Sequence, residues 1–303
     1  MSHPKFLRST LAAGLAATLA LAASTAGAQA LVGLTSSNQI TRFDAATPGS
    51  ATSVTISGLA AGDRFVGLDL RPSNNTIYGI TTSNQIYTVD EFTGAATFVA
   101  ALSAPLMSGN AGWGLDFNPV ADFAGAASLR VVSSAGANLA VNVNTGAVGN
   151  AASNIGAGYT GAAYTNSSPA GAPASTALYY INSDTSTLHF AASAFNAPTI
   201  STVGALGVNV VGANGFEIMP NGMAFAALNV DNSSSLATGI YSISLATGAA
   251  SLLGTYNGTL SGLTVSAVPE PGTYGLLGAG LGVVLLMARR RRNSASSPSR
   301  AMA

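Results

Sequence analysis

The sequence predicts an all-β protein, a five-bladed β-propeller with four strands in each blade. A motif of the form Gly–apolar–acidic–apolar–x–Pro recurs as GLDLRP from Gly67, GLDFNP from Gly114 and GFEIMP from Gly215. Weaker copies start at Gly161 and Gly262, so that successive motif glycines are 47, 47, 54 and 47 residues apart. Four short strands in a repeat of about 40–50 residues are typical of a propeller blade.

Each repeat continues with further strand patterns in the same order. The unit that starts at Gly67 contains TIYGIT (76–81), QIYTVD (85–90), a Thr93-Gly94 turn and ATFVAAL (96–102). Alternating β-branched and aromatic residues indicate strands. The Thr-Gly pairs suit hairpin turns, which need a residue with positive φ. No amphipathic helical pattern is found inside the repeat region.

The two ends of the repeat region complement each other. It begins with LVGLT and NQITRFD, without a Gly-led strand, and it ends with a lone Gly-led strand at Gly262–Ser266. We expect these ends to pair into a fifth blade, because closing the ring removes exposed sheet edges. A β-solenoid or a pair of sandwiches is the alternative. The segment NSSPAGAPAST (Asn166–Thr176), within the 54-residue interval, is expected to be a surface loop in either architecture.

The composition excludes several classes of site. There is no cysteine, so disulfides, thiolate metal sites and a cysteine nucleophile are excluded. His189 is the one histidine of the body, so a zinc or iron site with several imidazoles cannot form within one chain. Between Leu31 and Val268 there are four arginines, ten Asp and Glu and no lysine. This mildly acidic body argues against nucleic acid as a partner.

Residues 1–28 are predicted to be a secretory signal peptide. Lys5 and Arg8 precede an apolar run from Leu11 to Ala23, and Ala26 and Ala28 form a small-x-small cleavage site for signal peptidase. An uncleaved membrane helix is the alternative.

A second apolar run, Tyr274–Ala288, lies near the C-terminus. As a helix it would be about 22 Å long, against about 30 Å for a hydrocarbon core, which makes it a weak single transmembrane helix. The arginines that follow it would stay in the cytoplasm and leave the body outside. The residues that mark this segment are Pro269, Glu270, Pro271, Arg289, Arg290, Arg291 and Arg292.

This order of a Pro-Glu-Pro triplet, an apolar helix and an arginine cluster resembles the PEP-CTERM sorting signal of Gram-negative bacteria. The resemblance implies processing by an exosortase, removal of the helix, and a place in exopolysaccharide and biofilm systems. A plain stop-transfer helix is the alternative. One departure from the PEP-CTERM pattern is the eleven residues after Arg292, because these signals usually end close to the arginine cluster. The expected organisation is a signal peptide (1–28), a propeller (31–268), a sorting and transmembrane signal (269–292) and a short cytoplasmic tail (293–303).

The body also resembles the domain-of-unknown-function family 4394, whose members often carry PEP-CTERM tails. The resemblance rests on GLTSSNQITRFD (33–44) and on FVGLDLRPSNNTIYGIT (65–81). It implies no known activity.

Asp69, Asp116 and Glu217 occupy the same place, two residues after the motif glycine, where Ala163 and Thr264 stand in the other units. If this position faces the axis, three carboxylates converge on the central channel. Their oxygens suit Ca²⁺, and no other cofactor is expected. The alternative is that the acids face solvated channel or blade-edge positions and take part in turn hydrogen bonds.

Catalytic arrangements have weaker support. His189 and Asp184 with a nearby serine would be needed for a triad, but no G-x-S-x-G motif is present. Asp69 and Glu217 are conceivable as a glycosidase pair. Trp113, with Phe65, Tyr164 and Phe216, is expected either in the inter-blade core or stacked on sugars. The SSNQ (36–39) and TSNQ (82–85) loops offer amides and hydroxyls to a polysaccharide, or serve as turns.

The sequence therefore predicts an exported protein. Its body would lie in the periplasm while the tail anchors it, and afterwards at the cell surface or outside the cell. A non-enzymatic propeller that binds exopolysaccharide is the leading interpretation. A polysaccharide hydrolase or lyase and a protein-contact propeller are the alternatives.

Overall fold

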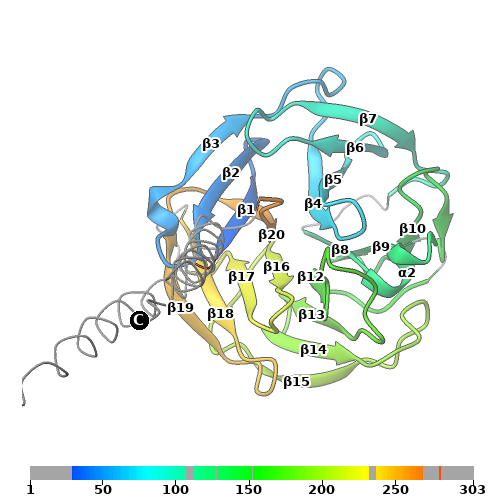
Figure 1. The fold of residues 1–303 in the computed structure, drawn as a ribbon. Helices are drawn as coiled ribbons and strands as arrows, with labels where there is room; N and C mark the ends of the chain where they lie inside the picture. Colours follow the sequence, from blue (N-terminus) through cyan, green and yellow to red (C-terminus); the bar gives the residue numbers. More distant parts are fainter. Residues whose placement is uncertain are drawn as a thin grey trace, which may run out of the picture. The chain divides into compact units, whose positions relative to one another are not determined.

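The computed structural model describes residues 29–106, 112–126, 128–151, 153–231 and 237–268, together with Gly280. Within these ranges the chain forms five four-stranded antiparallel sheets, arranged as blades around a central axis (Figure 1). The predicted five-bladed propeller is confirmed.

In every blade the four strands follow one another from the axis outward. Blade 1 contains β20 (Leu260–Val265), β1 (Ala30–Thr35), β2 (Gln39–Asp44) and β3 (Thr52–Thr55). Blade 2 contains β4 (Phe65–Arg71), β5 (Thr76–Thr81), β6 (Gln85–Val89) and β7 (Ala96–Ala101). Blade 3 contains β8 (Trp113–Phe117), β9 (Leu129–Ser133), β10 (Asn138–Val141) and β11 (Val148–Gly149). Blade 4 contains β12 (Tyr159–Tyr164), β13 (Leu178–Asn182), β14 (Thr187–Ala191) and β15 (Ser201–Ala205). Blade 5 contains β16 (Gly215–Ile218), β17 (Ala224–Leu228), β18 (Thr238–Ile243) and β19 (Ala250–Tyr256).

Blade 1 closes the ring with strands from both ends of the repeat region. The antiparallel partner of β1 on its inner side is β20, and Val32 lies opposite Thr264. The first strand of the blade therefore comes from the C-terminal end and the other three from the N-terminal end, as the repeat predicts.

The hydrophobic core is divided among the five blade junctions. Between blades 2 and 3, for example, Tyr78 and Ile80 pack with Leu115 and Phe117, and the rings of Tyr78 and Phe117 meet edge to face at 5.7 Å. Each blade buries its two faces against its neighbours. The apolar residues of the repeated motif therefore have a structural role in the core.

The Thr-Gly turns contact the preceding blade. Gly94 and Gly146 have φ of +72° and +74°, and a Cβ at either would collide with a backbone carbonyl of the previous outer strand, at Thr55 or Ala101. Glycine is required there by both its conformation and its neighbour.

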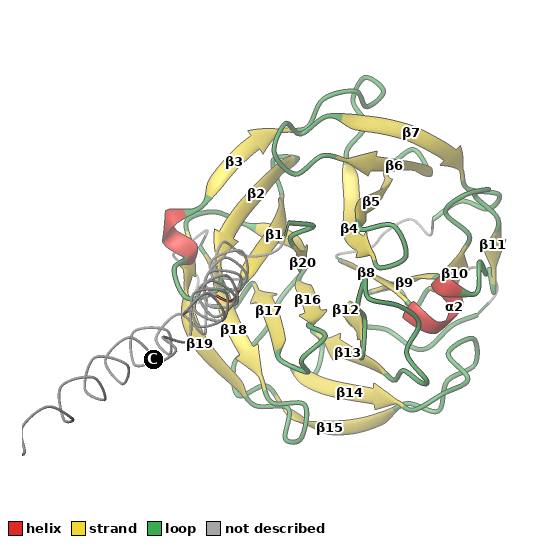
Figure 2. Cartoon of the chain, viewed as in Figure 1, coloured by secondary structure: helices red, strands yellow, loops and turns green. Residues whose placement is uncertain are grey.

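Two short helices interrupt the strands (Figure 2): a 3-10 helix, η2 (Pro48–Ser50), and α2 (Pro119–Phe123). They do not conflict with the predicted all-β class, because helices of three and five residues are too short to show an amphipathic pattern. Asn118 caps α2, its side chain accepting from the backbone N–H of Ala121. The segment Asn166–Thr176 is a loop between β12 and β13, as expected.

The signal-peptide residues Ala26 and Ala28 lie outside the described residues. So does the sorting segment 269–292, apart from Gly280. In the part of the chain that the structure describes, no helix is long and apolar enough to cross a membrane.

Candidate functional site

The five inner strands approach one another most closely at the motif glycines. A Cβ on Gly114 would lie 2.7 Å from the backbone nitrogen of Ala162 in the next blade. Gly67, Gly114, Gly215 and Gly262 line a cavity of only about 10 Å³ on the axis. Glycine is therefore required at this motif position because the neighbouring inner strand leaves no space for a Cβ, and the channel is narrow there.

Two residues further along, four of the five inner strands contribute a side chain to a polar layer, while β12 has Ala163 there. One carboxylate oxygen from each of Asp69, Asp116 and Glu217 lies within 4.8 Å of the others, and the three residues are 3 %, 2 % and 4 % exposed. The structure thus brings together the three acids that share the motif position, each from a different blade.

The side chains at this motif position connect neighbouring blades by hydrogen bonds, and we call these contacts the blade clasp. The backbone N–H of Phe117 donates to Asp69 Oδ2 (2.8 Å), and that of Tyr164 donates to Asp116 Oδ1 (2.9 Å). The N–H of Leu70 donates to Thr264 Oγ1 (3.0 Å). In three of the five junctions the motif side chain thus holds the following inner strand, and this is a structural reason for its polarity.

Thr264 also connects two of the acids. Its hydroxyl lies 2.7 Å from Asp69 Oδ1 and 3.0 Å from Glu217 Oε2. A hydroxyl has one proton to donate, so the second of these bonds requires a protonated carboxyl group as donor. The layer therefore holds at least one proton when both bonds are formed.

The electrostatics lead to the same conclusion. Burial raises the pKa of Asp69 to about 7, against the hydrogen bonds from Thr264 and Phe117. Burial and the neighbouring carboxylates raise the pKa of Asp116 well above its usual range. Burial and the charge of Asp69 do the same for the pKa of Glu217. Near neutral pH the layer is therefore only partly ionised.

The donor set fits the predicted Ca²⁺ in part. Carboxylate oxygens are the right chemistry, but Ca²⁺ takes about six to eight oxygen ligands. Both oxygens of Asp69 already accept hydrogen bonds. The space beside Glu217, at the end of the channel where the inner strands finish, is about 30 Å³. Calcium stays a prediction.

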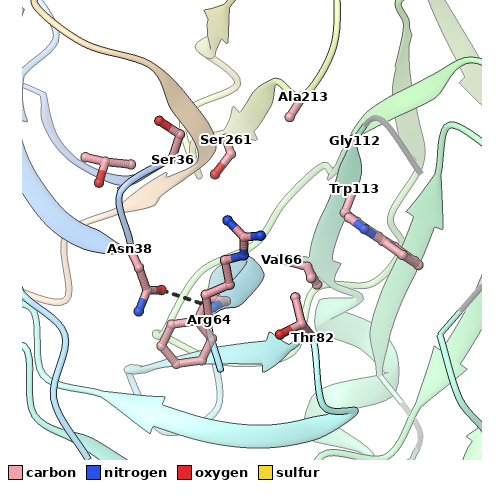
Figure 3. Close-up of a pocket in the computed structure, with 11 residues that line it drawn as sticks. Ser36, Asn38, Arg64, Val66, Thr82, Gly112, Trp113, Ala213 and Ser261 are labelled. Atoms are coloured by element: carbon pink, nitrogen blue, oxygen red, sulfur yellow. Dashed lines mark hydrogen bonds between the residues drawn. The ribbon is translucent and has the colours of Figure 1, made fainter. Parts of the chain in front are cut away.

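The opposite end of the axis, where the inner strands begin, opens into a cavity of about 260 Å³, which we call the mouth pocket. Figure 3 shows the Arg64 guanidinium over its middle, with Trp113 on one side and Ser36 and Asn38 on the other. Thr82 and Ser261 also line it, and none of its described lining residues is Asp, Glu or His. Sequence reasoning did not single out Arg64, because it stands just before the repeated strand.

The two SNQ loops take part in the fold and in the pocket. Asn38 and Asn84 adopt left-handed φ of 59° and 63°. Their side-chain carbonyls accept from the backbone N–H groups of Phe65 (3.1 Å) and Leu106 (2.7 Å). The loops are therefore turns that brace the next segment, and Asn38 keeps its amide NH₂ group at the pocket.

The remaining candidates lie elsewhere. The imidazole of His189 on β14 contacts threonine hydroxyls, with Nε2 2.7 Å from Thr187 Oγ1, and burial lowers its pKa. Phe65, Tyr164 and Phe216 are buried between blades, whereas Trp113 is half-buried at the pocket. Of the four aromatic residues considered, Trp113 and Phe65 line the cavity.

The fold and the axial sites define a closed five-bladed propeller with a polar pocket at one end of its axis. The model of the family Domain of unknown function (DUF4394) matches residues 39–264, and the chain belongs to that family. The model of the PEP-CTERM protein-sorting motif matches residues 267–292. The chain is thus a secreted, exosortase-sorted surface protein with a propeller body, exported by the signal-peptidase route.

No curated protein shows significant sequence similarity to the chain. Among solved structures, a protein of unknown function from Bacteroides thetaiotaomicron is 12 % identical with a TM-score of 0.45, over 76 % of this chain and 58 % of its own. The chain thus spans less than two thirds of that protein. The calcium-binding protein regucalcin from Agrobacterium tumefaciens is 13 % identical with a TM-score of 0.40, over 73 % and 68 % of the two chains. At this level of similarity neither structure informs the site.

Proposed function

We propose that this protein is a non-enzymatic propeller that binds exopolysaccharide at the cell surface or in the biofilm matrix, with the mouth pocket as its ligand site. Before processing, its C-terminal segment holds the body on the periplasmic side of the inner membrane. The observation that carries the proposal is the mouth pocket itself, which combines a half-buried Trp113, an exposed Arg64 and a hydroxyl- and amide-bearing rim. Aromatic side chains with a few convergent polar groups are the usual lining of a small-molecule site, and an aromatic ring offers a flat apolar face for a sugar ring.

The distribution of titratable groups favours binding over catalysis. General acid–base chemistry needs a titratable side chain within hydrogen-bond reach of the substrate, and the described lining of the mouth pocket contains no Asp, Glu or His. Asp69 and Glu217 are close together, but both bind Thr264 in a buried layer. The cavity of about 30 Å³ beside Glu217 leaves no space for a sugar.

The test uses the full-length protein in detergent and the exopolysaccharide of its own source bacterium. We expect the protein to co-sediment with the polymer and to release no reducing ends or unsaturated products. Trp113→Ala is expected to weaken binding about tenfold through lost stacking area, and Trp113→Phe to weaken it less. Phe98→Ala is the control, because Phe98 is a 54 % exposed aromatic on the outer strand β7.

The result distinguishes the alternatives. Release of products would establish the hydrolase or lyase, and binding that Trp113→Ala leaves unchanged would exclude the mouth pocket. Neither binding nor cleavage would favour the protein-contact propeller.

A further inference from the structure

Arg64 differs from the other three arginines of the propeller. Arg71 is paired with Asp122 at 2.6 Å. Arg130 is hydrogen-bonded to side chains that include Asn138 (3.1 Å). The guanidinium carbon of Arg42 lies 4.1 Å from the centroid of the Phe92 ring. These three arginines are held by the fold.

The Arg64 guanidinium has no hydrogen-bond or ion-pair partner among the described residues, and it extends over the mouth pocket (Figure 3). Oδ1 of its neighbour Asp63 accepts from the Thr82 hydroxyl (2.6 Å) and from the backbone N–H of Ser83 (3.0 Å), while the buried Oδ2 has no hydrogen-bond partner among the described residues. A free cation at a pocket whose described lining residues include no acid is a site for an anion.

Two further unengaged groups of the pocket, the Asn38 amide NH₂ and the Trp113 indole N–H, can only donate, whereas the Ser36 hydroxyl can donate or accept. The carbonyl of the Asn38 side chain is occupied by Phe65 N–H, which leaves its NH₂ group as the available part. The indole N–H of Trp113 has no hydrogen-bond partner among the described residues, and an indole can only donate. A ligand that satisfies Arg64, Asn38 and Trp113 must therefore offer acceptors to them.

The pocket is also blind. Below it the axis narrows to the cavity of about 10 Å³ at the motif glycines, and Trp113 lines both spaces. With about 260 Å³, the mouth pocket is smaller than the roughly 300–1,000 Å³ of pockets for drug-sized ligands. This volume and the closed floor suit one sugar unit, at a chain end or on a side branch, and not the interior of a threaded chain.

We infer that the mouth pocket selects a negatively charged sugar unit, a uronic acid or a sulfated sugar, whose anionic group binds Arg64 while its ring packs on Trp113. This inference rests on the proposed function, and it makes Arg64 the specificity-determining residue.

The test compares chemically matched forms of the same polymer. The full-length protein is titrated with the exopolysaccharide in its native form, after carboxyl reduction, and after desulfation. We expect the native form to bind best and one of the two treatments to weaken binding about tenfold, the size of a lost charge-assisted hydrogen bond. The treatment that weakens binding identifies the anion.

Arg64→Gln is expected to weaken binding of the native polymer to the same degree. It should not weaken further the binding of the polymer whose anionic group has been removed. Arg64→Lys retains the charge and is expected to retain part of the affinity. Because the Arg64 side chain is exposed and its guanidinium has no partner among the described residues, the variants should have the melting temperature of the wild type. A loss of binding would then not be a loss of fold.

Equal binding of the native, reduced and desulfated polymers would overturn the inference and leave the proposed function standing. The same holds for unchanged native binding by Arg64→Gln. Absence of binding to all three forms would overturn both.

Discussion

Asp69 and Thr264 are separated by 195 residues, yet the Thr264 hydroxyl lies 2.7 Å from Asp69 Oδ1. The same hydroxyl accepts from the backbone N–H of Leu70 and reaches Glu217. Strand β20 therefore completes the polar layer of the axis in the same step that completes blade 1. One side chain thus supports the closure of the ring and binds two of the three buried acids.

Thr264→Val is expected to destabilise the propeller by roughly 3 kcal/mol, because an isosteric methyl group leaves a backbone N–H and two buried carboxyl groups without their partner. The free energy of unfolding from urea titration checks this. Thr97→Val, at an exposed position on the outer strand β7, is the matched control and should change stability little. Equal effects of the two substitutions would show that the hydrogen bonds of Thr264 in the blade clasp contribute nothing to the free energy of unfolding.

Stability is expected to fall as the pH rises through about 7. The folded-state pKa of Asp69 is raised to about 7 from an ordinary value of 3.8, so the folded state binds more protons than the unfolded state between these values. The stabilisation is fully present below the lower value and is lost above the higher one, by on the order of a few kcal/mol. Melting curves at pH 5.5 and pH 8.5 measure it, and a flat profile would contradict it.

Asp69→Asn separates this effect from other titrations. An amide cannot ionise but keeps a carbonyl acceptor, so we expect the variant to lose much of the difference in Tm between the two pH values. A variant with the same pH dependence as the wild type would assign the effect to another group.

Adding Ca²⁺ at pH 8.5 tests the calcium prediction, because ionised carboxylates are the form that binds metal. A rise in Tm that Asp116→Asn abolishes would confirm the prediction. No rise in the wild type would show that the acids serve the blade clasp alone.

Most of the fold could be predicted from the sequence repeat. Its period, its strand order and the incomplete blade at each end predict five blades and their closure by β20 and β1. The position of the acids was also predictable, because residues at one repeat position face the axis together. The repeat cannot show how the side chain at one position is used. Thr264 joins two acids, for example, through contacts between residues that are far apart in the sequence.

The mouth pocket could not be predicted either, because it too depends on which residues meet in three dimensions. Arg64 lies just outside the repeated motif, and it is notable because the other arginines of the propeller are held by partners, a fact of tertiary structure. The helix α2 was missed because five residues show no period, although the Asn118-Pro119 pair is a helix-start signal.

Gly114→Ala is expected to destabilise the propeller by about 3 kcal/mol, at the upper end for overpacking. The added Cβ would lie 2.7 Å from Ala162 N and 2.8 Å from Gly161 C, and these backbone atoms cannot move without shifting β12. Gly49→Ala is the control, since its Cβ would meet Thr255 O at an ordinary 3.7 Å. Thermal melting compares the two, and a Gly114→Ala protein as stable as the control would disprove the close approach of the inner strands.

Glu91 holds the last residues before the sorting segment. This 4 % exposed carboxylate accepts from the Ser266 hydroxyl (2.9 Å) and from the backbone N–H of Ala267 (2.8 Å). Glu91→Ala is therefore expected to loosen the chain at Ser266–Ala267 and to cost about 1–3 kcal/mol for the hydrogen bonds lost. Faster hydrogen exchange at the Ala267 amide would report the loosening. Glu91→Gln keeps one carbonyl acceptor and should show a smaller effect. Unchanged exchange in Glu91→Ala would mean that the junction is held by other contacts, such as that of Asn75 with the Ala267 carbonyl.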